Sequence, residues 1–183
     1  LVAKGAETPA ERGFGEDDAQ WLQDNGFDVV RLGLSPDAFM PTPGLVDTDY
    51  LTSFAGTVQQ LTDHGLLVLI DLHQDGWGPV TSGNGFPDWM TFAHGAENTH
   101  TGFPLYYITN PAIQAAFDSF WANEKADGVG LQDHVATMFS ALADSAYTVP
   151  SALTTTSRAA SPGTSAMAIC QLKPSGSSSG SSR

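Results

Sequence analysis

Cysteine and basic side chains are both scarce in this chain of 183 residues. The single cysteine, Cys170, excludes an intrachain disulfide, so cysteine usage indicates no redox compartment. Only 7 Lys and Arg residues stand against 20 Asp and Glu, which gives a formal net charge of −13. Because an acidic chain repels phosphate backbones, we expect no nucleic-acid partner.

Long apolar runs are missing as well. No stretch reaches the length that crosses a membrane, and no signal peptide is recognisable after Leu1. Many Asp and few Lys residues are usual in secreted or salt-adapted proteins, and the composition is typical of both.

The end of the chain differs in composition from the rest. Residues 151–183 contain ten Ser and four Thr but no acidic and no aromatic residue. Such a sequence cannot pack a core. We therefore expect a globular domain over residues 1–148 and a disordered Ser/Thr/Gly-rich tail over residues 149–183.

A repeated pattern of helix, glycine and apolar strand organises the first part of the chain. Acidic residues favour the first turn of a helix, and glycine favours its end. The predicted order is a helix from Glu16 that stops at Asn25-Gly26, a strand over Phe27–Leu34, a helix from about Asp49 to His64 capped by Asp47 and stopped by Gly65, and a strand over Leu66–Leu72. Helix and strand in this alternation predict an α/β fold with a parallel sheet.

A long segment without period follows, from Gln74 to Asn110. Loops of this length in a compact domain are usually functional. Asn110-Pro111 then predicts the start of a helix, and another helix is expected from Leu131 to Asp144. The loop is rich in aromatic residues that can stack on sugars, hold a lipid or pack the loop onto the domain: Trp77, Phe86, Trp89, Phe92, Phe103, Tyr106 and Tyr107.

Asp71, His73 and Asp75 alternate at the end of the second predicted strand. Alternate side chains of an extended backbone share a face, and parallel-strand ends carry the chemistry of barrel enzymes. Three interpretations stand: a substrate-binding site, a divalent-metal site, or turn and cap residues with a hydrogen-bonded histidine. His94 and His100 lack a ligand spacing and are expected at the surface.

Arg31 lies near the end of the preceding strand, between Val30 and Leu32. A buried arginine needs carboxylate or carbonyl partners. Arg31 is therefore expected either to orient an acid in the site or to close a structural ion pair.

Several segments in order resemble glycoside hydrolase family 5, in its endoglycoceramidase-like branch. The segment from Trp21 to Gly33 is similar to the second βα unit of the family, and Leu69–Asp75 is similar to the third strand of the branch. The resemblance covers about residues 1–145 and continues through Gly85–Trp89, Asn110-Pro111, Phe117–Asn123 and Gly128–Asp133.

The resemblance implies a partial (β/α)8 barrel of about three to four βα units. It also implies retaining hydrolysis of a β-glycosidic bond, with a glycosphingolipid or related β-glucoside as substrate, without a cofactor. In this branch Arg31 would steady the nucleophile, and His73 and Asp75 would hold sugar hydroxyls. Lys4 would contact the sugar, and Trp121 would form a wall of its pocket. No stable partner is expected, but transient contact with a membrane surface follows from a glycolipid substrate.

Two features of the family are missing from this sequence. The acid/base glutamate of the family lies in an Asn-Glu-Pro triplet, which does not occur here, and the nucleophile lies further on. Asn123-Glu124-Lys125 is no substitute, because Glu124 follows a helical segment. We therefore expect this chain to be inactive, as a fragment of a secreted hydrolase.

Two alternatives to the glycosidase function remain. A separate hypothesis concerns the tail. The alternatives are a metal-dependent barrel hydrolase that uses Asp71, His73 and Asp75, and a non-catalytic remnant that binds sugar or lipid. The tail is hypothesised to be out of frame, because codons for Thr155–Arg158 can read Asn-Glu-Pro in a shifted frame.

Overall fold

The computed structural model describes residues 7–148, and side chains up to residue 145. Lys4, Cys170 and the tail predicted for residues 149–183 therefore lie outside the described residues. The elements in chain order are α1 (Glu16–Asp24), β1 (Val29–Leu34), α2 (Pro36–Phe39), α3 (Thr48–Asp63), β2 (Leu67–Leu72), the 3₁₀ turns η1 (Pro79–Thr81) and η2 (Asp88–Met90), α4 (Tyr106–Thr109), α5 (Pro111–Trp121), β3 (Lys125–Ala126), β4 (Val129–Gly130) and α6 (Leu131–Thr148).

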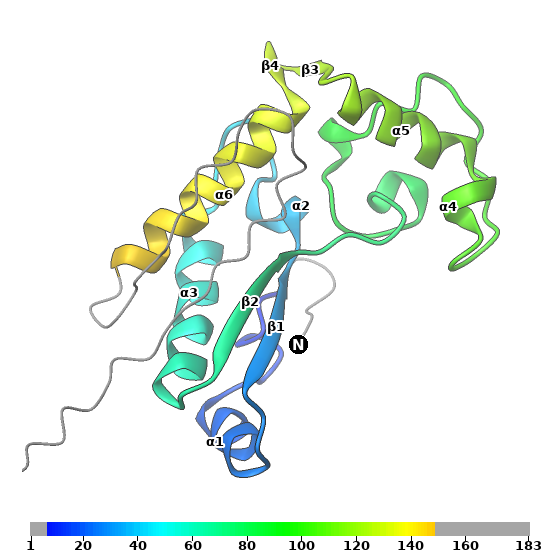
Figure 1. Ribbon diagram of the computed structural model, residues 1–183. Coiled ribbons are helices and arrows are strands. Elements are labelled where there is room, and N and C mark those ends of the chain that lie inside the picture. Colours follow the sequence, from blue (N-terminus) through cyan, green and yellow to red (C-terminus); the bar gives the residue numbers. More distant parts are fainter. Residues whose placement is uncertain (1–6, 149–183) are drawn as a thin grey trace, which may run out of the picture.

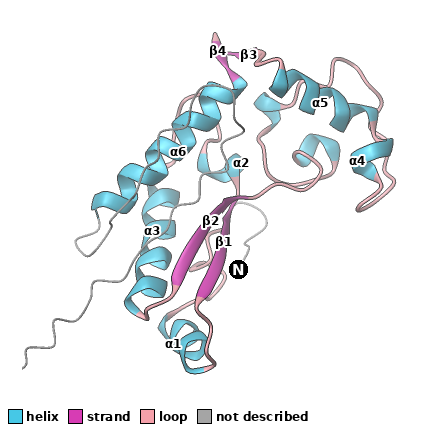
Figure 2. Ribbon diagram, in the orientation of Figure 1, coloured by secondary structure: helices cyan, strands magenta, loops and turns pink. Residues whose placement is uncertain are grey.

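β1 and β2 form a parallel two-stranded sheet, and α3 lies in the connection that leads from β1 to β2 (Figure 1). The register pairs Val29 with Leu67 and Leu34 with Leu72, so both strands end at the same edge. α3 and α6 lie together along one side of the sheet (Figure 2). This arrangement confirms the predicted α/β fold. Within residues 7–148 there are two strand-to-helix units, β1–α3 and β2–α6, whereas three to four were expected for the whole chain.

Local sequence explains where the helices begin. The Asp18 carboxylate accepts a hydrogen bond from the Gly15 N–H, and three acidic residues occupy the first turn of α1. The Asp47 side chain caps α3 through the N–H groups of Asp49 and Tyr50. Asn110 caps α5 in the same way, and Pro111 occupies the first turn. The predicted caps at Asp47 and Asn110 are therefore confirmed.

Some boundaries differ from the prediction. β1 begins at Val29 instead of Phe27, because the turn after α1 continues through Gly26 and the Phe27 N–H bonds to the Leu22 carbonyl. α6 runs on to Thr148, beyond the expected end at Asp144. The short β3–β4 hairpin was not predicted at all.

The main hydrophobic core lies between the sheet and the helices. One face of β1 contributes Val30, Leu32 and Leu34, which pack among buried side chains of α3 and α6. The period-two alternation of β1 places Val29 and Arg31 on the opposite face, where both are exposed. No helix of the described part covers that second face in Figure 2. The uncovered face is where the candidate site begins.

The irregular segment after β2 has a second core of its own. Trp77 is 1% exposed and contacts three aromatic rings at centroid distances of 4.7–5.8 Å, those of Phe86, Phe117 and Phe120. The buried residues Ala112, Ile113 and Ala116 of α5 lie outside the main core as well. Aromatic contacts thus fix a segment in which regular backbone pairing is sparse.

Candidate active site

Arg31 and Asp71 form an ion pair on the uncovered face of the sheet. The Arg31 guanidinium lies 2.8 Å from Asp71 Oδ2. The pair forms because Asp71 is the partner of Gly33 in the register, two residues from Arg31 on the same face. The expected partner of Arg31 is therefore confirmed. Its expected burial is wrong, since the side chain is 58% exposed, on a face that no helix within residues 7–148 covers (Figure 2).

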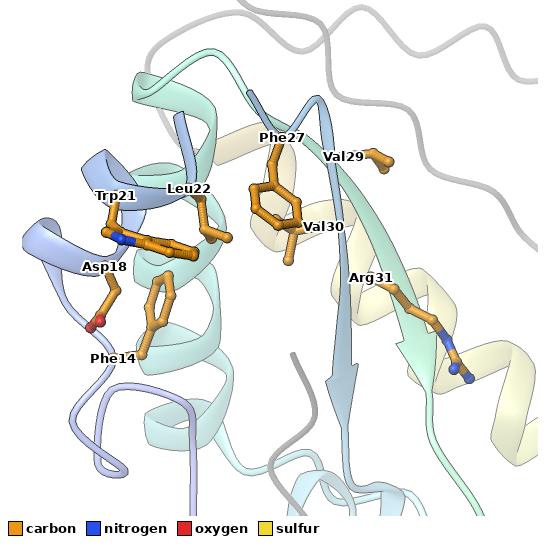
Figure 3. A pocket seen from close by; sticks show the side chains of 8 residues that line it. All are labelled: Phe14, Asp18, Trp21, Leu22, Phe27, Val29, Val30 and Arg31. Carbon is orange, nitrogen blue, oxygen red and sulfur yellow. The ribbon is translucent and has the colours of Figure 1, made fainter. Parts of the chain in front are cut away.

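Arg31 also borders an open pocket beside β1. The pocket is lined mainly by Phe14, Trp21, Leu22 and Phe27. Figure 3 shows the Arg31 side chain extending away from these apolar side chains, so its charged end lies outside their cluster. The pocket itself is apolar, and the charged end of Arg31 belongs to the site at the strand ends.

His73 joins two carboxylates at the end of β2. Its Nδ1 lies 3.0 Å from Asp71 Oδ2, and its Nε2 lies 3.3 Å from Asp75 Oδ2. The His73 backbone N–H donates to the Leu34 carbonyl, which extends the parallel pairing by one residue beyond the strand. The structure therefore brings together Arg31, Asp71, His73 and Asp75, which we call the charged cluster.

Asp75 is held by a neighbouring chain segment. Its backbone N–H and carbonyl both pair with Asn84 at 2.8 Å. The glycines on either side of Asn84 are required, because a Cβ at Gly83 would overlap the Asp75 carbonyl and a Cβ at Gly85 would overlap Gln74. Gly85 also adopts φ +127°, which favours glycine. The close approach of this glycine-flanked segment fixes the backbone of Asp75.

Tyr107 belongs to the aromatic set predicted for the loop, but its contact with the charged cluster was not predicted from the sequence. Its hydroxyl accepts a hydrogen bond from the Gly76 N–H at 3.1 Å and donates to Asp75 Oδ1 at 3.4 Å. Burial, with the neighbouring Tyr107 hydroxyl and the Asp75 charge, raises the pKa of Tyr106 to about 12. The aromatic loop thus reaches the charged cluster through Tyr107. A tyrosine 32 residues away from an aspartate gives no local sequence signal of this contact.

Other candidates are not joined to the charged cluster by a described contact. Trp121, predicted to form a wall of the sugar pocket, is 61% exposed at the end of α5 and packs on Phe120. Its role stays a prediction, as does that of Lys4. Glu124 bonds to the exposed His94, and His100 bonds to Ser82 at the surface. The surface location predicted for both histidines is confirmed.

The geometry does not favour a metal site at Asp71, His73 and Asp75. Both ring nitrogens of His73 face carboxylate oxygens, so neither nitrogen is directed at a vacant position between the three side chains. Across residues 7–148, no group of three or more His, Cys, Asp and Glu side chains is arranged to hold a metal ion. The cluster is instead a hydrogen-bonded surface of carboxylate, imidazole and guanidinium groups.

The aromatic residues of the loop divide into buried and exposed groups. Trp77, Phe86, Trp89 and Phe92 pack against one of the two cores or between them. By contrast, Phe103, Leu105 and Ile108 are 53–73% exposed at and just before α4. Among residues 7–148, no helix combines the length and apolar character needed to span a bilayer. Most of the predicted aromatic set therefore packs the loop, and one small apolar patch faces outward.

Comparison with known proteins agrees with this geometry. The family model described as Cellulase (glycosyl hydrolase family 5) matches residues 5–136. Endoglycoceramidase I of Rhodococcus hoagii is 41% identical over 137 residues, which are 74% of this chain and 27% of that protein.

Two solved structures share the fold and about a third of the aligned residues. Endoglycoceramidase II from Rhodococcus sp. with a five-membered iminocyclitol has a TM-score of 0.66 at 31% identity, over 79% of this chain and 35% of that chain. The same enzyme with ganglioside GM3 has a TM-score of 0.63 at 31% identity, over 73% and 32%. The chain thus spans roughly a quarter to a third of the length of these relatives.

Proposed function

Because the chain belongs to glycosyl hydrolase family 5, we propose that it forms part of a retaining β-glycosidase that acts on glycosphingolipids. The observation that carries this proposal is the charged cluster at the shared ends of β1 and β2. In a (β/α)8 barrel this edge of the sheet carries the substrate, and the uncovered face of β1 and β2 would line the barrel interior. The bound ganglioside in the related structure supports the substrate class.

The charged cluster suits sugar binding and orientation of charge. Asp75 is fixed by backbone pairing, and its carboxylate can accept hydrogen bonds from sugar hydroxyls. His73, held between Asp71 and Asp75, orients the Asp75 carboxylate toward such a hydroxyl. Arg31 supplies positive charge on the same face, where it can steady a carboxylate that attacks the anomeric carbon.

Bond cleavage requires groups that the cluster does not supply. Retaining hydrolysis uses one carboxylic acid to protonate the leaving oxygen and one carboxylate as nucleophile, about 5–5.5 Å apart. Asp71 is engaged by Arg31 and His73, and Glu124 lies with His94 at the surface. The sequence contains no Asn-Glu-Pro triplet. We therefore infer that the 183-residue chain binds the glycan without hydrolysing it.

A binding and turnover assay on the purified chain tests this proposal. Lactosylceramide in detergent micelles is offered to the chain, and both bound lipid and released lactose are measured. We expect binding without release, and binding at least about tenfold weaker in Asp75→Asn, because a charge-assisted hydrogen bond is lost. Asp49→Asn, with the same charge change on exposed α3, serves as the control. Lactose release that disappears in Glu124→Gln, or binding that is equal in Asp75→Asn and wild type, would contradict the proposal.

The exposed apolar patch near α4 supports transient contact with a membrane surface. Phe103 and Ile108 are 73% and 72% exposed, and the patch is joined to Asp75 through Tyr107. Aromatic and aliphatic side chains of this kind insert at the boundary between lipid headgroups and acyl chains. A secreted parent enzyme would meet its glycolipid at such a surface, with the patch beside the site.

Vesicle sedimentation tests the membrane contact. Phosphatidylcholine vesicles that contain lactosylceramide should carry down the wild-type chain several-fold more than the double variant Phe103→Ser/Ile108→Ser. Phe27→Ser removes an exposed phenylalanine next to α1 and is the matched control. If both variants sediment as the wild type does, the patch near α4 does not contact the membrane.

A further inference from the structure

A pocket separate from the charged cluster lies between the loops that follow β1 and β2. Its volume is about 540 Å³, and half of its lining residues are prolines: Pro41, Pro43, Pro79 and Pro87. Trp89, Thr42, Asp37 and Asp88 complete the lining. Both loops leave the same edge of the parallel sheet, which is the edge that carries the charged cluster.

Asp37 is the lining residue that connects the pocket to the charged cluster. The Asp37 N–H donates to the Gly85 carbonyl at 2.8 Å. Gly85 in turn packs so closely on the His73 carbonyl and on Gln74 that no Cβ fits there. Asp37 therefore lies on a short, rigid path of backbone from His73.

Trp89 is held in one position as a wall of the pocket. Its Nε1–H donates to the Met40 carbonyl at 3.2 Å, and its ring meets the buried His134 ring edge-on at 4.8 Å. Proline rings are stiff as well. A ligand that meets these walls loses little affinity to side-chain ordering, which is one of the costs of binding at a flexible surface.

The chemistry of the lining selects a class of ligand. An indole face and pyrrolidine rings offer flat apolar surfaces for the C–H groups of a pyranose. The carboxylates of Asp37 and Asp88 accept hydrogen bonds, and the Asp37 carboxylate is oriented by Ser35 Oγ and by the Ala38 N–H. No basic residue lines the pocket, so an anionic sugar would meet two carboxylates without a counter-charge.

We propose that this pocket, bounded by Trp89, Asp37 and Asp88, binds a neutral hexose unit at a position separate from the charged cluster. This proposal rests on the proposed function to the extent that the hexose belongs to the glycan of the same substrate. The pocket then acts as a second point of attachment for an extended sugar chain. It discriminates against a sialic acid at that position through the repulsion between carboxylates.

Titration of the ¹⁵N-labelled full chain with lactose tests the pocket. The Trp89 indole N–H signal is assigned by its loss in Trp89→Phe and is followed in the NMR spectrum. We expect this signal to shift in saturable fashion in the wild type and in His73→Ala. The apparent dissociation constant should rise about tenfold in Asp88→Asn, because an exposed charged acceptor is lost without a change in packing. Asp49→Asn is the matched control, and circular dichroism verifies that each variant is folded.

The outcomes separate this proposal from the proposed function. A saturable Trp89 shift that persists in His73→Ala supports the pocket even if lactosylceramide does not bind at the charged cluster. Lactose binding that perturbs the His73 ring but leaves the Trp89 signal unmoved would overturn the pocket and leave the proposed function standing. N-acetylneuraminic acid should leave the Trp89 signal in place. A shift as large as that produced by lactose would overturn the assignment to a neutral sugar.

Discussion

The region up to Leu72 and the segment from His73 to Trp121 are stabilised in different ways. The first region buries one face of β1 and β2 under helices, with side chains at the spacing that helices and strands impose. The second region folds around Trp77 and three further aromatic rings, with few regular elements before α5. The difference shows that the loop beside the site has an aromatic cluster of its own, which joins the main core through Phe86 and Phe120.

The main core and the Trp77 cluster are expected to differ in stability. Locally packed units open with free energies of their own, up to that of the whole domain. The charged cluster spans the boundary, because Arg31 and Asp71 belong to the strands while Asp75 is clamped by Asn84 of the loop. Variants on either side of this boundary therefore test how independent the two regions are.

Removal of the Trp77 side chain has the largest expected effect. Trp77→Ala should lower the free energy of unfolding by about 3–5 kcal/mol, because a large, fully buried ring leaves a cavity. Hydrogen exchange should accelerate in residues 73–121 more than in β1 and β2. Trp121→Ala, at a 61% exposed position, should cost less than about 1 kcal/mol. Equal acceleration of exchange in both regions would show that they unfold as one unit.

A methyl group added at Gly85 tests the contact between the two regions beside Asp75. Gly85→Ala should lower stability by about 1–3 kcal/mol, because the residue adopts a positive φ and its Cβ would overlap Gln74. Gly95→Ala has a positive φ but open space, so it should cost about 1 kcal/mol or less. Chemical denaturation measures both. Identical losses would mean that the close approach at Gly85 has no energetic consequence.

Removal of the helix caps at Asn110 and Asp47 compares the two regions through smaller losses of stability. Asn110→Ala should cost about 2 kcal/mol, because the buried side chain caps α5 and also donates to Asn98 and to the Thr99 carbonyl. Asp47→Ala removes an exposed cap of α3 and should cost about 1 kcal/mol. Thermal melts of the two variants give the difference. A larger loss for Asp47→Ala would contradict the anchoring role of Asn110.

Ionisation of Tyr106 gives the smallest effect and reports on the loop alone. Burial raises the pKa of Tyr106 from 10.0 to about 12, so the folded chain keeps a proton that the unfolded chain releases. The contribution of this proton to the free energy of unfolding is therefore fully present below pH 10. It is lost as the pH rises from about 10 to about 12. Absorbance near 295 nm should show late titration of Tyr106 and of Tyr50, whose pKa burial also raises, and Tyr106→Phe should remove the contribution of Tyr106 alone. Titration of all tyrosines near pH 10 would contradict the burial of this hydroxyl.

Much of the fold could be predicted from local pattern. The acidic first turn, the caps at Asp47 and Asn110 and the glycine stops gave correct helices, since each acts through neighbouring backbone groups. The β3–β4 hairpin was missed, although Asp127-Gly128 is a typical pair for a turn in which both residues have positive φ. The strands of this hairpin are two residues long, which is too short for a hydrophobic period that would predict them.

The candidate site was predictable only in part. The alternation of Asp71, His73 and Asp75, and the matching position of Arg31, follow from the side-chain direction on adjacent strands. Tyr107 contacts Asp75 from 32 residues away in the sequence. Asn84 pairs with the Asp75 backbone, which is possible because the glycines beside Asn84 allow the two chain segments to approach closely. Such contacts have no local signature, because they arise from the path of an irregular loop.

The sequence by itself determined the α/β alternation, the helix ends, the family and the residues at the strand ends, since these depend on short-range periodicity and on motifs. Only the tertiary structure decided that Arg31 is exposed, that Trp77 forms a second core and that Tyr107 joins the site. It also decided that Trp89 and four prolines line an open pocket separate from the cluster. Burial and long-range contact depend on which segments pack together, and packing is a property of the whole folded chain.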